Sequence, residues 1–88
     1  MKNIDPKIFG LNKRNKIYET NDGKVVIVKN RRSRIVMKDG NNIMEIADKI
    51  KKVIPEAKIT LLATAPICSK TKAFLERNGI QTKQADVL

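Results

Sequence analysis

The chain has 88 residues, of which 41% are apolar, and 19 Lys and Arg against 9 Asp and Glu give it a net charge of +10. This length supports one hydrophobic core, so we predict a single domain over 1–88 with residues 1–12 as an N-terminal arm. The chain has no His, which excludes histidine catalysis. Its single Cys excludes a multi-cysteine metal site and a disulfide within the chain. It also lacks an apolar run long enough for a membrane span. We therefore expect a cytoplasmic protein with no metal and no cofactor.

The first half of the chain predicts the arm followed by a three-stranded antiparallel meander. Asp5-Pro6 favours a single helical turn, with Asp as the cap and Pro at the first helical position. Strands are expected over 16–20 and 24–29, because Asn21-Asp22-Gly23 between them is typical of a hairpin turn. Alternating apolar and polar residues predict the third strand over 33–38.

The second half predicts helices that alternate with strands. A helix that begins at Asn41 or Asn42 and ends before Pro55 has its apolar residues at three-to-four spacing. A strand over 57–64, a second helix from Pro66 to Asn78 and a last strand over 80–87 follow. The order is β-β-β-α-β-α-β. We predict a two-layer α/β (or α+β) fold, in which an antiparallel meander leads into βαβ units with right-handed crossovers.

The positive charge is concentrated in the expected meander. Residues 1–40 carry +7 and residues 41–88 carry +3. The acid-free segment from residue 24 to residue 38 holds six cations, which we take as candidate ligands of nucleic-acid phosphates: Lys24, Lys29, Arg31, Arg32, Arg34 and Lys38. The other interpretation is a solvated rim that keeps a small protein soluble.

Only three aromatic residues are present, namely Phe9, Tyr18 and Phe74, which excludes a platform for base stacking. The main prediction is therefore a small non-catalytic protein that binds the backbone of DNA or RNA, with a marked dependence on salt.

The element order resembles the core of the PD-(D/E)XK restriction-endonuclease-like superfamily. Those enzymes need an acid on one strand and an acid-x-Lys triplet on the next, which together hold Mg²⁺ against the scissile phosphate. This chain has Ile27-Val28-Lys29, so the lysine is present and Ile27 stands where the acid belongs. The substitution argues against an active nuclease.

A second resemblance covers residues 58–87. Thr64-Ala65-Pro66-Ile67-Cys68, the later Gly79-Ile80 and Asp86-Val87 resemble the first βαβ unit of glutaredoxins. The resemblance implies a βαβ unit, but Ala65 replaces the nucleophilic Cys, and one Cys cannot support dithiol exchange within the chain.

The residues around the single cysteine are a second candidate site. A thiol at a helix N-terminus beside cations has a lowered pKa, and the same helix start attracts anions. The alternative function is therefore a thioredoxin/glutaredoxin-like or anion-binding protein centred on Cys68, Ser69, Lys70 and Thr71. The competing interpretation is that Cys68 packs under the sheet as a small apolar residue.

A further alternative is a homo-oligomeric interaction module. The strand expected over 24–29 is apolar on both faces, and two helices packed on one side of the sheet would leave two valines or a valine and an isoleucine uncovered. The arm or a second copy of the chain would then have to cover that face.

Overall fold

The computed structural model describes residues 2–85, and the predicted α/β class and β-β-β-α-β-α-β order are confirmed. The elements are β1 (Lys2–Ile4), a 3₁₀ turn η1 (Pro6–Phe9), β2 (Lys16–Glu19), β3 (Val25–Lys29), α1 (Met37–Val53), β4 (Ile59–Ala63), α2 (Ser69–Arg77) and β5 (Ile80–Gln84). Neither helix of the described residues has the length and the apolar run that crossing a bilayer would need.

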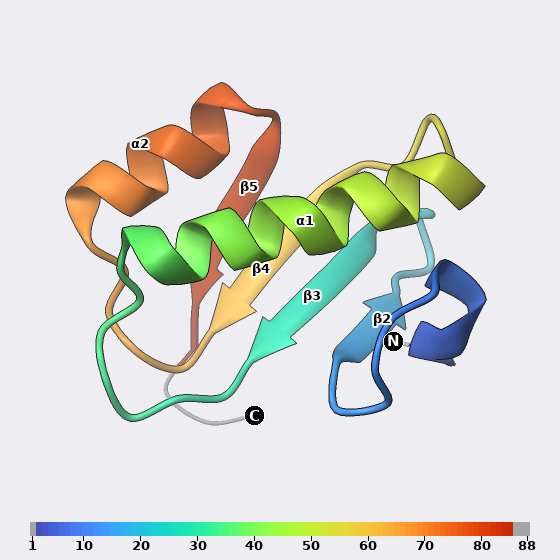
Figure 1. Cartoon of the computed structure of the whole chain (residues 1–88), viewed down its shortest axis with the longest axis horizontal. Helices are drawn as coiled ribbons and strands as arrows, with labels where there is room; N and C mark the ends of the chain where they lie inside the picture. The colour runs from blue at the N-terminus through green and yellow to red at the C-terminus, as the bar shows by residue number, and fades with distance from the viewer. Residues whose placement is uncertain (1, 86–88) are drawn as a thin grey trace.

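One five-stranded sheet, in the order β1-β2-β3-β4-β5, organises the domain. The first three strands form an antiparallel meander, and β3, β4 and β5 run parallel to one another. The two crossovers step in the same direction across the sheet, so connections of one hand place both helices on one face (Figure 1). The core lies between that face and the helices, and its fully buried side chains include Ile17, Ile27, Leu61, Ile80, Ile43, Ile50 and Leu75.

The position of the third meander strand was predicted wrongly. It is β1 in the arm, and the segment 33–38 instead contributes only a single bridge between Ile35 and Ile67. The backbone N–H of Val36 donates to Asp39 Oδ2 at 2.9 Å, so α1 begins at Met37 and not at Asn41 or Asn42. The side-chain cap from Asp39, just after the segment, thus overrode the alternating pattern.

The other predicted boundaries hold to within a few residues. The arm has the expected turn, since the N–H of Lys7 donates to Asp5 Oδ1 at 3.0 Å and Pro6 opens η1. The second helix begins at Ser69, three residues after Pro66, with Cys68 as its N-cap. The last strand ends at Gln84, and the predicted part of it over 86–87 lies outside the described residues.

The sheet face opposite the helices carries Val26 and Val28, which are nevertheless only 6% and 8% exposed. The strand register places Tyr18 and Thr60 beside Val26, and Leu62 beside Val28. Neighbouring side chains of the sheet therefore cover these valines. Neither the arm nor a second copy of the chain is needed to bury them.

Candidate nucleic-acid interface

The carboxyl ends of the parallel strands lie at one edge of the sheet, because Lys29 pairs with Ala63 and Ala63 pairs with Gln84. Loops 30–36 and 64–68 follow these strand ends. The loop before β2 lies at the same edge, because Lys16 pairs with Val28. In an open α/β sheet this edge is where ligands usually bind.

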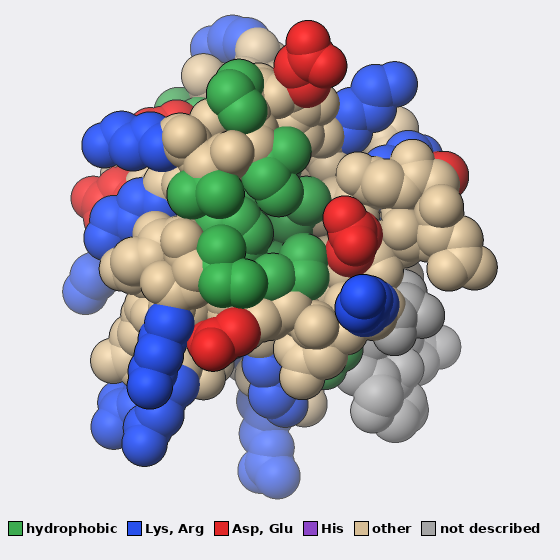
Figure 2. Space-filling model, turned by 90° about the vertical axis from the view of Figure 1, so that its right-hand side faces the viewer, with side chains coloured by type: hydrophobic (Ala, Val, Ile, Leu, Met, Phe, Trp, Pro, Cys, Tyr) green, Lys and Arg blue, Asp and Glu red, His purple; other side chains and the backbone are tan. Residues whose placement is uncertain are grey.

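Cations from four segments gather at this edge. We call the set the basic edge; its members are Lys13, Arg14, Lys16, Lys29, Arg31, Arg32, Arg34, Lys38 and Lys70. The loops that carry most of them run along the lower side of Figure 1, and Lys and Arg side chains project from the lower end of the molecule in Figure 2.

Both helices point their N-termini at the basic edge. The bridge between Ile35 and Ile67 joins the two loops that lead into α1 and α2. A helix N-terminus carries partial positive charge, so Lys38 and Lys70 in the first turns each disfavour their helix by about 0.3–1 kcal/mol. The first turn of α2 has no acidic residue to offset this. An anion bound at this edge would relieve the repulsion.

Thr64 holds the start of loop 30–36 in place. Its Oγ1 accepts a hydrogen bond from the N–H of Arg31 at 2.8 Å. The same hydroxyl lies 3.1 Å from Asn30 Oδ1 and 3.0 Å from the carbonyl oxygen of Arg31, and it can donate to either. The loop is thereby tied to the end of β4, which fixes where its arginines leave the sheet.

Arg31 is ion-paired with Asp39, whose other carboxylate oxygen accepts from the N–H of Val36. Desolvation raises the pKa of Asp39, but the hydrogen bonds from Val36 and Arg31, with the charge of Lys29, outweigh it and lower the pKa overall. Asp39 thus neutralises part of the charge of Arg31.

Three other cations of loop 30–36 and of the start of α1 remain free to meet a ligand. Arg32, Arg34 and Lys38 are exposed, and within residues 2–85 none of them has an ion pair. They are the side chains of the basic edge best placed to contact phosphates.

Lys29 is the lysine of the acid-x-Lys position and is only partly exposed. Its Nζ lies 3.5 Å from Asn42 Oδ1 on α1. Desolvation lowers its pKa, Arg31 acts in the same direction, and Asp39 opposes both. Ile27, two residues earlier, is 1% exposed and belongs to the core under the helices. The described residues contain no group of three His, Cys, Asp or Glu side chains that could hold a metal ion.

The structure brings together most of the residues predicted from the sequence and separates one. Lys24 precedes β3 at the opposite end of the strand from Lys29, where its Nζ lies 3.8 Å from Asp22 Oδ2. The segment 24–38 is therefore not a meander but a strand, a loop and the first turn of a helix. The other five predicted cations lie on the basic edge, and the start of α2 joins them there.

Three cations of the basic edge escaped the sequence analysis, namely Lys13, Arg14 and Lys16. The predicted hairpin already indicated their position, because the start of its first strand must lie beside the end of its second strand. Asn12 shapes this loop: its side-chain oxygen accepts from the N–H of Arg14 at 2.9 Å.

Cys68 is partly exposed at the N-cap of α2. The N–H groups of Lys70 and Thr71 lower the pKa of its thiol most, the Thr71 side chain and Arg34 add to the effect, and desolvation opposes it. Ser69 and Lys70 are exposed beside it, whereas Thr71 is fully buried. The thiol thus lies on the basic edge and not under the sheet.

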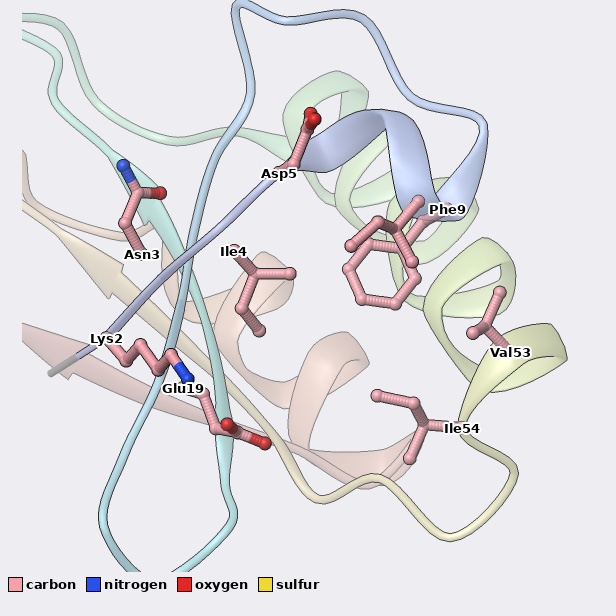
Figure 3. Close-up of a pocket in the computed structure, with 9 residues that line it drawn as sticks. Lys2, Asn3, Ile4, Asp5, Phe9, Glu19, Val53 and Ile54 are labelled. Atoms are coloured by element: carbon pink, nitrogen blue, oxygen red, sulfur yellow. The ribbon is translucent and has the colours of Figure 1, made fainter.

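A second surface feature lies at the β1 side of the domain. An apolar patch lines a cavity of about 320 Å³ there (Figure 3). The patch consists of Ile4, Ile8, Phe9, Val53 and Ile54, with Lys2, Asp5 and Glu19 at its rim. Ile8 is 59% exposed and Val53 is 49% exposed. The patch appears as the green area at the centre of Figure 2.

Three solved structures share the fold. A repair endonuclease from Pyrococcus abyssi superimposes with a TM-score of 0.66 and 18% identity over 80% of this chain. EndoMS in a complex named EndoMS-dsDNA2 gives a TM-score of 0.66 at 17% identity, and apo EndoMS gives 0.65 at 17%, each again over 80% of this chain. The match spans 31%, 29% and 33% of those chains, in the same order.

No protein-family model and no curated protein sequence matches the chain. The structural matches overturn the resemblance of residues 58–87 to glutaredoxins: the βαβ unit is part of a sheet that the chain shares with repair endonucleases. Many βαβ units have a helix that starts soon after a Pro and is followed by a Gly, as Gly79 follows α2 here. This explains the misleading local match. The fold of this chain is thus that of a part of these endonuclease chains.

Proposed function

We propose that this protein is a non-catalytic domain that binds the phosphate backbone of double-stranded DNA along the basic edge. The observation that carries the proposal is the convergence of cations from four segments at the one edge where both helix N-termini also point. Phosphates are the anions that such an arrangement attracts in a protein with a net charge of +10.

The choice of duplex DNA rests on two observations. A structural neighbour with the same fold is described in a complex with double-stranded DNA. Within the described residues, Phe9 is buried in the core and Phe74 packs against it, so neither offers a ring to unpaired bases. Phosphate contacts position a protein without reading sequence, and we therefore expect weak sequence preference.

Phosphodiester hydrolysis is not part of the proposal. The position of the acid in the acid-x-Lys pattern is Ile27, and its side chain lies in the core beneath α1. Asp39, the acid of the basic edge, is already engaged by Arg31 and the N–H of Val36.

The test compares two triple variants of equal charge change. The first, Arg32→Ala/Arg34→Ala/Lys38→Ala, removes three exposed cations of the basic edge. The control, Lys52→Ala/Lys58→Ala/Arg77→Ala, removes three exposed cations near the opposite ends of α1, β4 and α2. Fluorescence anisotropy with a labelled duplex, at salt concentrations from about 50 to about 200 mM, gives the slope of log K against log salt for each protein.

If each removed cation contacts a phosphate, the slope of log K against log salt falls in magnitude by up to about 2.7 in the first variant, from about 0.9 per contact. The control retains the slope of the wild type. Absence of binding at low salt, or an equal loss in both variants, would refute the proposal.

Self-association is a second candidate, and the apolar patch favours it. The patch combines two strongly exposed large apolar side chains with a rim of two acids and one lysine, Asp5, Glu19 and Lys2, so two +10 chains repel each other less there than at the basic edge. Sedimentation velocity at two concentrations tests it. A dimer that Val53→Lys dissociates supports the patch as the interface, and a monomer at both concentrations removes it.

A further inference from the structure

The thiol of Cys68 has a geometry that an inert cysteine does not need. Cys68 is the N-cap residue of the nine-residue helix α2, where its side chain makes no cap hydrogen bond. Its own N–H donates to the carbonyl of Ile35 at 2.9 Å, and its carbonyl accepts from the N–H of Lys72 at 2.8 Å. The backbone of Cys68 is thus fixed from both sides, while its side chain remains partly exposed at the basic edge.

A second, independent feature at the same helix start is the hydroxyl of Thr71. Thr71 is 0% exposed, and its Oγ1 has no hydrogen-bond partner among the described residues. A buried hydroxyl without a partner costs about 1–3 kcal/mol. This cost indicates that the hydroxyl is a donor for a charged group, which is absent while the neighbouring thiol is protonated.

Gly40 on α1 determines which way Thr71 is turned. A Cβ at Gly40 would lie 2.9 Å from Thr71 Cγ2, so the methyl group faces α1 and fills the space that the glycine leaves. The hydroxyl is consequently directed elsewhere, and it is one of the groups that favour the charged form of Cys68. Arg34 is the charged side chain that acts on this thiol, and no acidic side chain among the described residues opposes it.

We propose that Cys68 is a modification site that reacts as a thiolate with small anionic disulfides, and that the amides of the α2 N-terminus and the unpartnered Thr71 hydroxyl are the donors available to the charged Sγ. Sγ attacks one sulfur of the disulfide, a bond forms between these two sulfurs, and the original disulfide bond breaks. The second sulfur leaves as a thiolate, so that one disulfide is exchanged for another with no net oxidation. Arg34 and Lys70 select a disulfide that carries carboxylates.

The product places negative charge among the cations of the basic edge. This consequence rests on the proposed function: bound carboxylates would compete with DNA phosphates, and a reductant would restore binding.

The test measures the rate of disulfide exchange of the full chain with 5,5′-dithiobis(2-nitrobenzoate), an anionic aromatic disulfide, as a function of pH. The midpoint of the rate is expected below the ~8.5 of a free thiol. Thr71→Val keeps the shape of the buried side chain, removes the hydroxyl and is expected to raise the midpoint. Thr60→Val, a buried threonine on the other face of the sheet, is the matched control and leaves it unchanged.

Charge selection is tested with cystamine, a cationic disulfide. Because the leaving thiolates of the two reagents differ in pKa, each rate is divided by the rate of the same reagent with 2-mercaptoethanol, an uncharged small thiol. We expect this normalised rate to be higher for the anionic reagent at low salt by at least about twofold, and the ratio of the two normalised rates to approach one at high salt as screening removes the attraction. A midpoint equal to that of the protein unfolded in denaturant, or no change with Thr71→Val, would overturn the proposal.

The effect on binding is measured separately with the duplex. A modified protein that binds DNA as tightly as the reduced one refutes the regulatory consequence only. Failure of the unmodified protein to bind refutes the proposed function and leaves the exchange rates as the test of Cys68.

Discussion

Gly40→Ala tests how tightly the two helices that present the basic edge are packed against each other. Gly40 lies in the first turns of α1, where its N–H donates to the carbonyl of Val36 at 2.9 Å. In an exposed helix, replacing Gly by Ala would stabilise the protein by about 1 kcal/mol. At this position, however, the new Cβ would lie 2.9 Å from Thr71 Cγ2 and 3.5 Å from Phe74 Cδ2.

The first of these distances is too short for two carbon atoms, and fully buried Thr71 has little room to move. Overpacking of this kind costs about 1–3 kcal/mol. The two effects together predict that Gly40→Ala lowers the free energy of unfolding by about 0–2 kcal/mol. Thr71→Ser removes the methyl group and makes room, so in that background Gly40→Ala is expected to stabilise by about 1 kcal/mol.

Urea denaturation of the wild type, both single variants and the double variant closes the cycle, with equal m-values as the check that only stability changed. Asn41→Ala is the matched control, since Asn41 is exposed on the same helix and its replacement changes helix propensity alone. If Gly40→Ala stabilises the wild-type chain as much as it stabilises the Thr71→Ser variant, the helices are not in close contact and the reasoning is refuted.

Two further predictions concern the loop between β3 and α1. Asp39→Ala removes the cap of α1 and should lower the free energy of unfolding by about 0.5–2 kcal/mol. It also releases Arg31 from its ion pair and should steepen the salt slope of duplex binding by up to about 0.9. A variant that loses both stability and affinity for the duplex would contradict the release of Arg31. The pKa of Asp39 is lowered in the folded state, so the stability that its charge contributes is present above the unfolded pKa of about 3.9 and is lost as pH falls through the folded pKa. The difference between the urea midpoints of the wild type and Asp39→Asn should therefore shrink in acid. Thr64→Val leaves the N–H of Arg31 without its acceptor and should cost about 1–3 kcal/mol, with faster hydrogen exchange over 30–36; protection equal to that of the Thr60→Val control would show that Thr64 does not anchor the loop.

Local patterns accounted for much of the fold. Asp5-Pro6 produced its turn, Asn21-Asp22-Gly23 joined two strands with Gly23 at a φ of +83°, and Val25–Lys29 became the central strand. Each of these depends on the backbone preferences of a few adjacent residues, and so the sequence determines it without help from distant contacts. The concentration of cations in the first half of the chain was equally visible in the sequence.

Tertiary structure alone decided which of those cations act together. Alternation over 33–38 favoured a strand, but the local bond from the N–H of Val36 to Asp39 made the end of this segment the start of a helix, and the contact of Gly40 with Thr71 fixed where that helix packs. Pairing of β2 with β3 then brought Lys16 to the end of β3 and left Lys24 at the other end of the strand. The net charge follows from composition, whereas the basic edge exists because parallel strands end together and their helices begin there, a relation between segments distant in the sequence.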